Sequence, residues 1–121
     1  MKFIMMFLLL VLSGCVNISS PKHKTVVNTP TEPPQLWSHH IKLSVSAEEC
    51  GNQGLRALES LGYNSTVKNG NYSYGNFGSN RAAVKCVSSE SGSFVYAIVA
   101  GPNKTQVEKL RNQLAQLLVN K

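Results

Sequence analysis

Three cysteines are the residues of this 121-residue chain with the most distinctive chemistry, and they stand in two different settings. Cys15 follows an apolar run, Phe3–Leu12, which is preceded by a single positive charge at Lys2. A charged start, a short apolar core and small residues before a cleavage site are typical of a secretory signal peptide. The run is too short to span a bilayer, which needs about 20 apolar residues. We therefore expect an exported protein.

The tetrapeptide Leu12-Ser13-Gly14-Cys15 resembles a bacterial lipobox. The resemblance implies that Cys15 receives a thioether-linked diacylglycerol, that the signal peptide 1–14 is cleaved before it, and that the new amine is acylated. In this class Asp after the cysteine commonly retains the protein in the inner membrane, whereas this chain has Val16. The resemblance thus implies a lipid anchor in the outer membrane, with the head facing the periplasm. An ordinary secretory-signal cysteine and a transmembrane end are the alternatives.

The other two cysteines, Cys50 and Cys86, form an even pair in a chain directed to an oxidising compartment. Such a pair favours one disulfide, and two buried free thiols are the alternative. The bond would close a loop of about 37 residues, for which chain-entropy arguments give roughly 4 kcal/mol at most. After the signal about 107 residues remain, enough for one small domain whose limited core benefits from such a bond.

Composition restricts the partners. The formal charge is +6, and without Lys2 it is +5, from 11 basic and 6 acidic residues. This excess favours anionic partners such as phospholipid headgroups, lipopolysaccharide or cell-wall carboxylates, and a mildly basic soluble surface is the simpler alternative. The basic residues are scattered without a Lys/Arg block, which together with export argues against nucleic acid.

A catalytic or metal-binding group is hard to assemble from this sequence. The chain has no Asp, so a Ser-His-Asp triad is excluded unless Glu replaces the Asp. His39 and His40 are adjacent and should point to opposite faces of a strand, and no His-x-x-x-His or Cys-x-x-Cys spacing is present. A hydrolase that uses Glu49 or His40 is the least favoured class. We therefore predict a non-enzymatic protein without metal or cofactor.

The chain divides into three parts. Four of its five prolines lie between Val16 and about Gln35, among Ser, Thr and Asn, which predicts an extended tether. We assign residues 1–14 to the signal peptide, 15–40 to the lipidated N-terminus and tether, and 41–121 to a small periplasmic domain. Ordered structure should begin near Trp37.

Hydrophobic periodicity predicts the elements of this domain. Residues 41–45 alternate as in a half-buried strand. Ser46 and Glu49 have capping-box spacing and should start a helix over 47–61. Cys50 lies on its apolar face. Further strands are expected near 65–68, 72–74, 80–88 and 94–100.

Turns and caps delimit these later strands. Asn69-Gly70 is a tight-turn signal, and we expect a loop after Tyr74. The apolar segment 94–100 should lie centrally in the sheet. Asn103 and Gln106 have capping spacing and should start a second helix. The apolar stripe of that helix consists of Val107, Leu110, Leu114 and Leu117.

Together these elements predict an α+β two-layer sandwich. It has a mainly antiparallel sheet of three or four strands, covered by two helices. Cys50 on the first helix should meet Cys86 on a middle strand. The order is strand, helix, two or three strands, helix.

The segment Tyr96–Pro102, which ends in Gly101-Pro102 and precedes an amphipathic helix, resembles the second half of SPOR domains. Ile41–Tyr63 would supply their earlier strand and helix, so that the resemblance covers about 80 residues. An additional strand candidate at 80–88 departs from the family pattern. SPOR domains bind peptidoglycan, and the resemblance therefore implies a glycan ligand.

Tyr72, Tyr74 and Phe77, interleaved with glycine and polar residues, form the candidate binding surface together with Arg81. A hairpin whose aromatic rings fold back onto the sheet is the alternative. We predict a non-enzymatic accessory component of an envelope or secretion assembly, which binds an envelope protein. A SPOR-like peptidoglycan-binding module and an inhibitor or immunity lipoprotein against a toxic enzyme are the alternative functions.

Overall fold

The computed structural model describes residues 32–120; the predicted signal, Cys15 and most of the predicted tether lie outside this range. The described chain has five strands and two helices in the order β-α-β-β-β-β-α, which confirms the predicted α+β class. The elements are β1 (Gln35–Leu43), α1 (Ala47–Ser60), β2 (Asn64–Asn69), β3 (Tyr72–Phe77), β4 (Asn80–Ser89), β5 (Gly92–Gly101) and α2 (Lys104–Val119).

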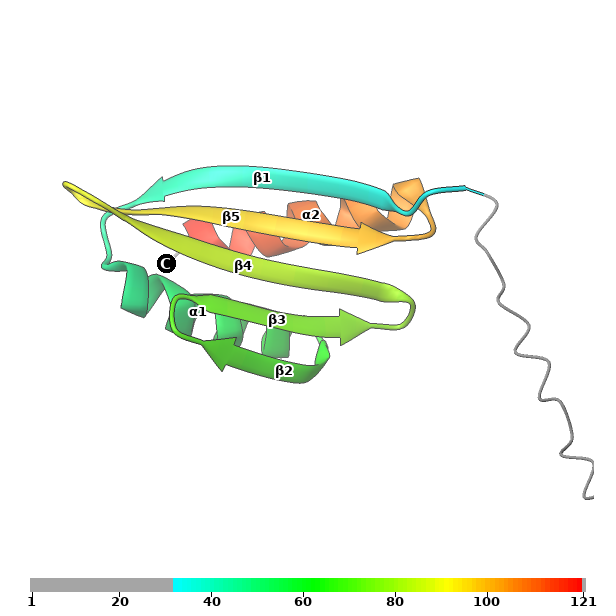
Figure 1. Cartoon of the computed structure of the whole chain (residues 1–121), viewed down its shortest axis with the longest axis horizontal. Coiled ribbons are helices and arrows are strands. Elements are labelled where there is room, and N and C mark those ends of the chain that lie inside the picture. Colours follow the sequence, from blue (N-terminus) through cyan, green and yellow to red (C-terminus); the bar gives the residue numbers. More distant parts are fainter. Residues whose placement is uncertain (1–31, 121) are drawn as a thin grey trace, which may run out of the picture.

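The strands form one antiparallel sheet in the order β1-β5-β4-β3-β2 (Figure 1). All the segments with strand character form strands, so the sheet has five strands rather than three or four. β5 lies between β1 and β4, as its apolar composition predicted. β1 begins at Gln35 and not at Ile41, so that residues 35–40 belong to the sheet. The apolar alternation is broken there by Leu36, which is apolar but lies on the exposed face, and by His39, which is polar but lies on the helix side.

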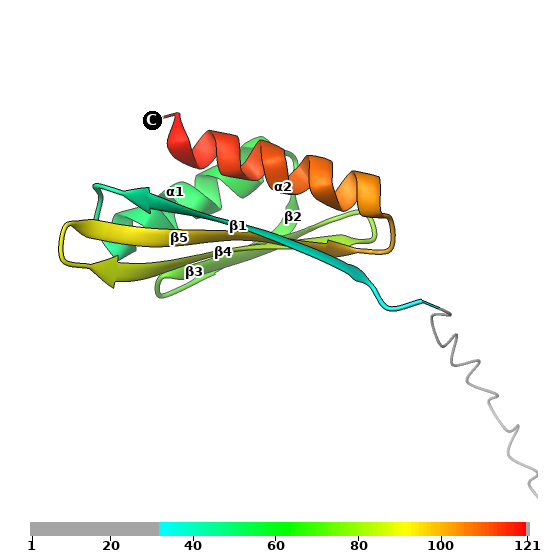
Figure 2. The ribbon, with the colours of Figure 1, turned by 90° about the horizontal axis from the view of Figure 1, so that it is seen from above.

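Both helices lie on the same side of the sheet, and the core fills the space between the two layers (Figure 2). Alternate residues of β4 and β5 point into it, as the period of two requires. On α2 the first three residues of the predicted apolar stripe are buried. The stripe is completed by the buried Leu118 and not by the predicted Leu117, which is 36% exposed. Position 118 lies about three full turns after Val107, which brings it back to the same side of the helix. The largest fully buried side chains include Leu58, Val84, Val95, Val99, Val107, Leu114 and Leu118.

Side-chain caps start both helices. Ser46 Oγ accepts a hydrogen bond from the Glu49 N–H at 3.1 Å, and Asn103 Oδ1 accepts one from the Gln106 N–H at 2.9 Å. The Glu49 carboxylate does not complete the predicted reciprocal box but accepts bonds from Arg56 at 2.7 Å and Asn52 at 3.3 Å. These bonds, the one from Arg56 foremost, hold the pKa of Glu49 below its usual value.

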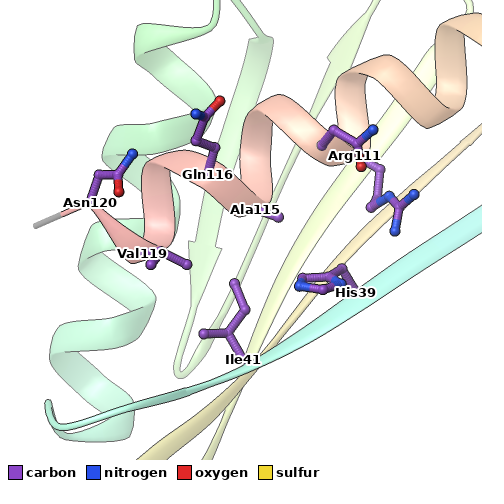
Figure 3. A pocket seen from close by; sticks show the side chains of 8 residues that line it. His39, Ile41, Arg111, Ala115, Gln116, Val119 and Asn120 are labelled. Atoms are coloured by element: carbon purple, nitrogen blue, oxygen red, sulfur yellow. The ribbon is translucent and has the colours of Figure 1, made fainter.

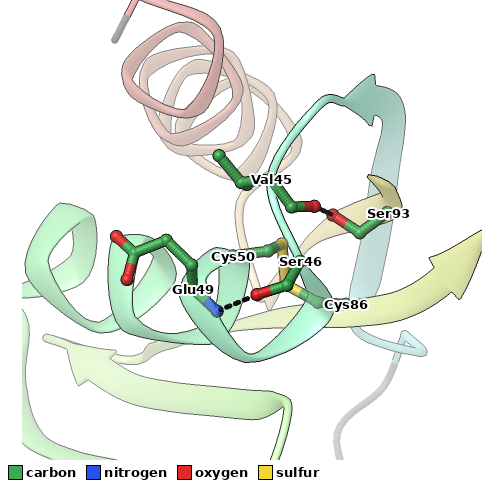
Figure 4. Close-up of a disulfide and its surroundings, with 6 residues drawn as sticks. All are labelled: Val45, Ser46, Glu49, Cys50, Cys86 and Ser93. Carbon is green, nitrogen blue, oxygen red and sulfur yellow. Dashed lines mark hydrogen bonds between the residues drawn. A yellow bond between two sulfur atoms is a disulfide. The ribbon is translucent and has the colours of Figure 1, made fainter. Parts of the chain in front are cut away.

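The Cys50–Cys86 disulfide is present and joins the first turn of α1 to β4 (Figure 4). The two Cα atoms are 6.0 Å apart, and Cys50 is fully buried. Close by, the Ser93 hydroxyl donates a hydrogen bond of 2.9 Å to the Val45 carbonyl. The bond attaches the β1–α1 connection to β5, so the helix start is held to two neighbouring strands.

Tight turns connect β2, β3 and β4. Gly70 and Asn71 separate β2 from β3, and Gly70 has a positive φ of 59°. The expected loop after Tyr74 is absent, because β3 continues to Phe77 and pairs with β4 along its whole length. This cross-strand pairing outweighs the low strand propensity of its glycine and asparagine. The hairpin therefore extends the sheet beneath the predicted binding residues.

A candidate binding face on the sheet

One face of the sheet has no helix packed on it within residues 32–120, and we call it the open face (Figure 2). Strand register and the alternation of side chains determine which residues it presents. These are Leu36, Ser38, His40 and Lys42 from β1; Phe94, Tyr96, Ile98 and Ala100 from β5; Arg81, Ala83, Lys85, Val87 and Ser89 from β4; Tyr72, Tyr74 and Asn76 from β3; and Val67 and Asn69 from β2.

Exposed apolar side chains gather on the open face. Eight large hydrophobic residues are exposed within 32–120, and six of them lie there, with exposed fractions from 38% to 68%. The remaining two, Leu117 and Val119, lie on α2. Exposed apolar side chains that gather on one face favour an interaction site more than the same number spread over the whole surface would. The six are Leu36, Val67, Tyr72, Val87, Phe94 and Tyr96.

All formal charges of the open face are positive. Lys42, Arg81 and Lys85 are exposed on it, and the five strands contain no carboxylate side chain. The glutamates of residues 32–120 lie instead before β1, on the helices and in the β4–β5 turn. No acidic side chain therefore neutralises these cations from within the strands. The face combines exposed apolar surface with positive charge.

Aromatic rings and cations lie next to one another across the strands. His40, Tyr96, Lys85 and Tyr72 are successive cross-strand partners from β1 to β3, and the rings of His40 and Tyr96 are 6.2 Å apart. A second contact joins β3 to β4. The Arg81 guanidinium lies 4.9 Å from the Tyr74 ring centre, and the Tyr72 and Tyr74 rings are 5.6 Å apart. Cation–π contacts of this kind favour defined positions of the rings.

Of the predicted binding residues, Tyr72, Tyr74 and Arg81 come together on the open face, whereas Phe77 does not join them. Phe77 lies an odd number of residues from both tyrosines and therefore points to the helix side, where its ring is 5.6 Å from that of Tyr63. Its ring is thus the one that folds back onto the core. Sequence reasoning missed Lys85, Phe94 and Tyr96, although the alternation within 92–101 could have identified the last two.

A shallow groove on the helix side has fewer reactive side chains than a catalytic site would need (Figure 3). It lies between β1 and α2, where His39 faces Arg111. Among its lining residues there is no carboxylate, thiol or hydroxyl that could act as a nucleophile or acid. It is lined by His39, Ile41, Arg111, Asn112, Ala115, Gln116, Val119 and Asn120.

The residues considered for hydrolysis do not meet. Glu49 lies on α1, on the helix side, whereas His40 lies beside Tyr96 on the open face. Burial raises the pKa of the Tyr63 hydroxyl to about 12. Residues 32–120 bring no three His, Cys, Asp or Glu side chains together as a metal would require. No helix in this part is long and apolar enough to cross a membrane.

Comparisons with models of protein families, with curated proteins and with solved structures find no match to this chain. The class that the structure defines is therefore an α+β domain with a helix-covered face and an open, aromatic and basic face.

Proposed function

We propose that this chain is an outer-membrane lipoprotein whose head binds another component of the cell envelope without catalysing a reaction. The observation that carries the binding role is the concentration of six of the eight exposed large hydrophobic residues on the open face. Three exposed cations accompany them. A soluble domain keeps such a surface exposed at a cost in solubility, which a binding role explains.

The lipobox at Leu12–Cys15 supports the location. Since β1 starts at Gln35, about 20 residues separate Cys15 from the sheet. A chain of this length reaches roughly 70 Å at full extension, so the head can engage partners away from the bilayer. The anchor and the open face then have separate tasks.

We expect Cys15→Ser to abolish lipid attachment and to leave the precursor uncleaved. The hydroxyl of serine cannot form the thioether that precedes cleavage in this class. Labelling of growing cells with a palmitate analogue, followed by mass analysis of the purified protein, measures both effects. Ser13→Ala serves as the control, because it keeps the thiol. Normal acylation and cleavage of Cys15→Ser would remove the anchor from the proposal.

Glycan binding is a second candidate, favoured by the exposed tyrosine rings at Tyr72 and Tyr96. Flat rings stack on sugars, and nearby cations suit the carboxylates of cell-wall peptides. The SPOR-like segment that ends in Gly101-Pro102 is consistent with this ligand. In this second candidate function, peptidoglycan binds across the open face.

Sedimentation with purified sacculi tests this candidate. If it is right, the head binds saturably, and Tyr72→Ala, Tyr74→Ala or Arg81→Ala weakens binding by about tenfold or more, since stacking and charged contacts are each of that order. Lys109→Ala on α2 removes an exposed positive charge from the other layer and should retain binding. A head that remains in the supernatant at all concentrations excludes peptidoglycan as the ligand.

A further inference from the structure

We propose that the occupant of the open face is a protein surface with an apolar centre and carboxylate side chains. In this complex Lys42, Arg81 and Lys85 pair with Asp or Glu residues of the partner. The inference rests on the proposed binding function and names the chemistry of the envelope component. Three observations lead to it: the dimensions of the face, its aliphatic residues and its charge.

The dimensions match those of a protein interface. Five strands about 4.8 Å apart, each about eight residues long, give a projected area of roughly 600 Å². Side chains that stand out from the sheet add to the accessible area. A stable protein–protein interface buries about 800 Å² on each partner. The open face is therefore large enough to form most of one side of such an interface.

Aliphatic side chains favour a protein over a sugar polymer. Leu36 is 68% exposed, and Val67 and Val87 are 42% and 43% exposed. Such side chains gain little from stacking on sugar rings, but they lose water when they pack against the apolar side chains of a partner. The tyrosine rings and Arg81 are of the types that dominate the binding energy of protein interfaces.

The charge of the face opposes a dimer in which the open faces of two copies of this chain meet. Two open faces placed together would bring Lys42, Arg81 and Lys85 of both copies into one desolvated layer. No carboxylate within the strands would be available to compensate them. Like charges in such a layer oppose association, whereas carboxylates of a different protein complement them. Charge complementarity thus selects an acidic partner.

Site-specific photo-cross-linking in intact envelopes tests the inference. A photoreactive phenylalanine analogue replaces Tyr96 on the open face, and Gln113 on the exposed side of α2 in a matched control. The full-length lipidated chain is used. We expect an adduct with one protein from position 96 and none from position 113. The residue that is cross-linked in the partner should lie in a surface with Asp or Glu.

Charge reversal then tests the pairing with the purified partner. We expect Arg81→Glu and Lys85→Glu each to weaken binding by about tenfold or more, and binding to weaken as salt increases. Lys109→Glu on α2 makes the same change in charge away from the face and should alter binding less than about twofold. Replacement of the facing Asp or Glu of the partner by Lys should restore binding of Lys85→Glu. Circular dichroism confirms that each variant is folded.

The outcomes separate this inference from the function on which it rests. An adduct from position 96 that muramidase digests, or one with a second copy of this chain, overturns the acidic protein partner. Binding that survives both charge reversals also overturns the acidic partner, but it leaves the proposed binding function intact. Adducts from position 113 alone overturn the open face as the site. Adducts from neither position contradict the proposed binding function itself.

Discussion

Removal of the Cys50–Cys86 disulfide should lower the free energy of unfolding of the head by up to about 4 kcal/mol. The bond joins residues 36 positions apart, and the chain-entropy relation gives close to this value for such a loop. Small domains have total stabilities of about 5–15 kcal/mol. A loss of this size is a large fraction of the total stability.

Urea unfolding of three samples measures this effect: the oxidised protein, the same protein with reductant, and the double variant Cys50→Ala with Cys86→Ala. The two proteins without the bond should unfold at similar, lower urea concentrations. The double variant lacks thiols and so serves as the control for effects of the reductant. If all three samples differ by less than about 1 kcal/mol, the entropic account of the cross-link is wrong.

Gly54→Val should destabilise the head by about 3 kcal/mol. At Gly54, helix α1 lies close to the sheet: a Cβ atom built there would lie 2.7 Å from both Ser73 Oγ and Val84 Cγ1. Overpacking of a core usually costs about 1–3 kcal/mol, and the branched valine side chain places still more atoms in the same space. The gain in helix propensity over glycine, below about 1 kcal/mol, recovers only part of this.

Thermal unfolding followed by circular dichroism checks this prediction. For a domain of this size 1 kcal/mol corresponds to roughly 4–8 °C, so the midpoint should fall by more than about 10 °C. Gln113→Val, a β-branched substitution on the exposed side of α2, should lower it by only a few degrees. Val84→Ala should partly relieve the crowding when it is combined with Gly54→Val. Equal melting temperatures for both valine variants would show that the helix and the sheet are not in close contact at this position.

Sequence reasoning succeeded where a local pattern and the tertiary environment agree. The N-caps Ser46 and Asn103 depend on residues within one turn. The inward positions of Cys50 and Cys86 follow from helix and strand periodicity alone. β5 was recognisable as an interior strand because both its faces carry apolar residues.

The remaining features depend on contacts between distant segments. β1 extends back to Gln35 because β5 offers a partner along its entire length, and no local alternation marks this start. Tyr74 and Arg81 were predicted as binding residues from one short stretch of the sequence. Lys85 joins them only through strand register, which no local pattern determines, and register also places Tyr96 beside it. The sequence therefore identified one corner of the open face and missed its centre.

Cys86 occupies a position in β4 that links the disulfide to the opposite side of the sheet. Its side chain points into the core, while those of its immediate neighbours, Lys85 and Val87, belong to the open face. The covalent bond thus fixes the strand directly behind the surface that we propose binds the partner. In the exported lipoprotein that we propose, this bond forms only after the chain has left the reducing cytosol, so the strand behind the open face gains its covalent support late in maturation.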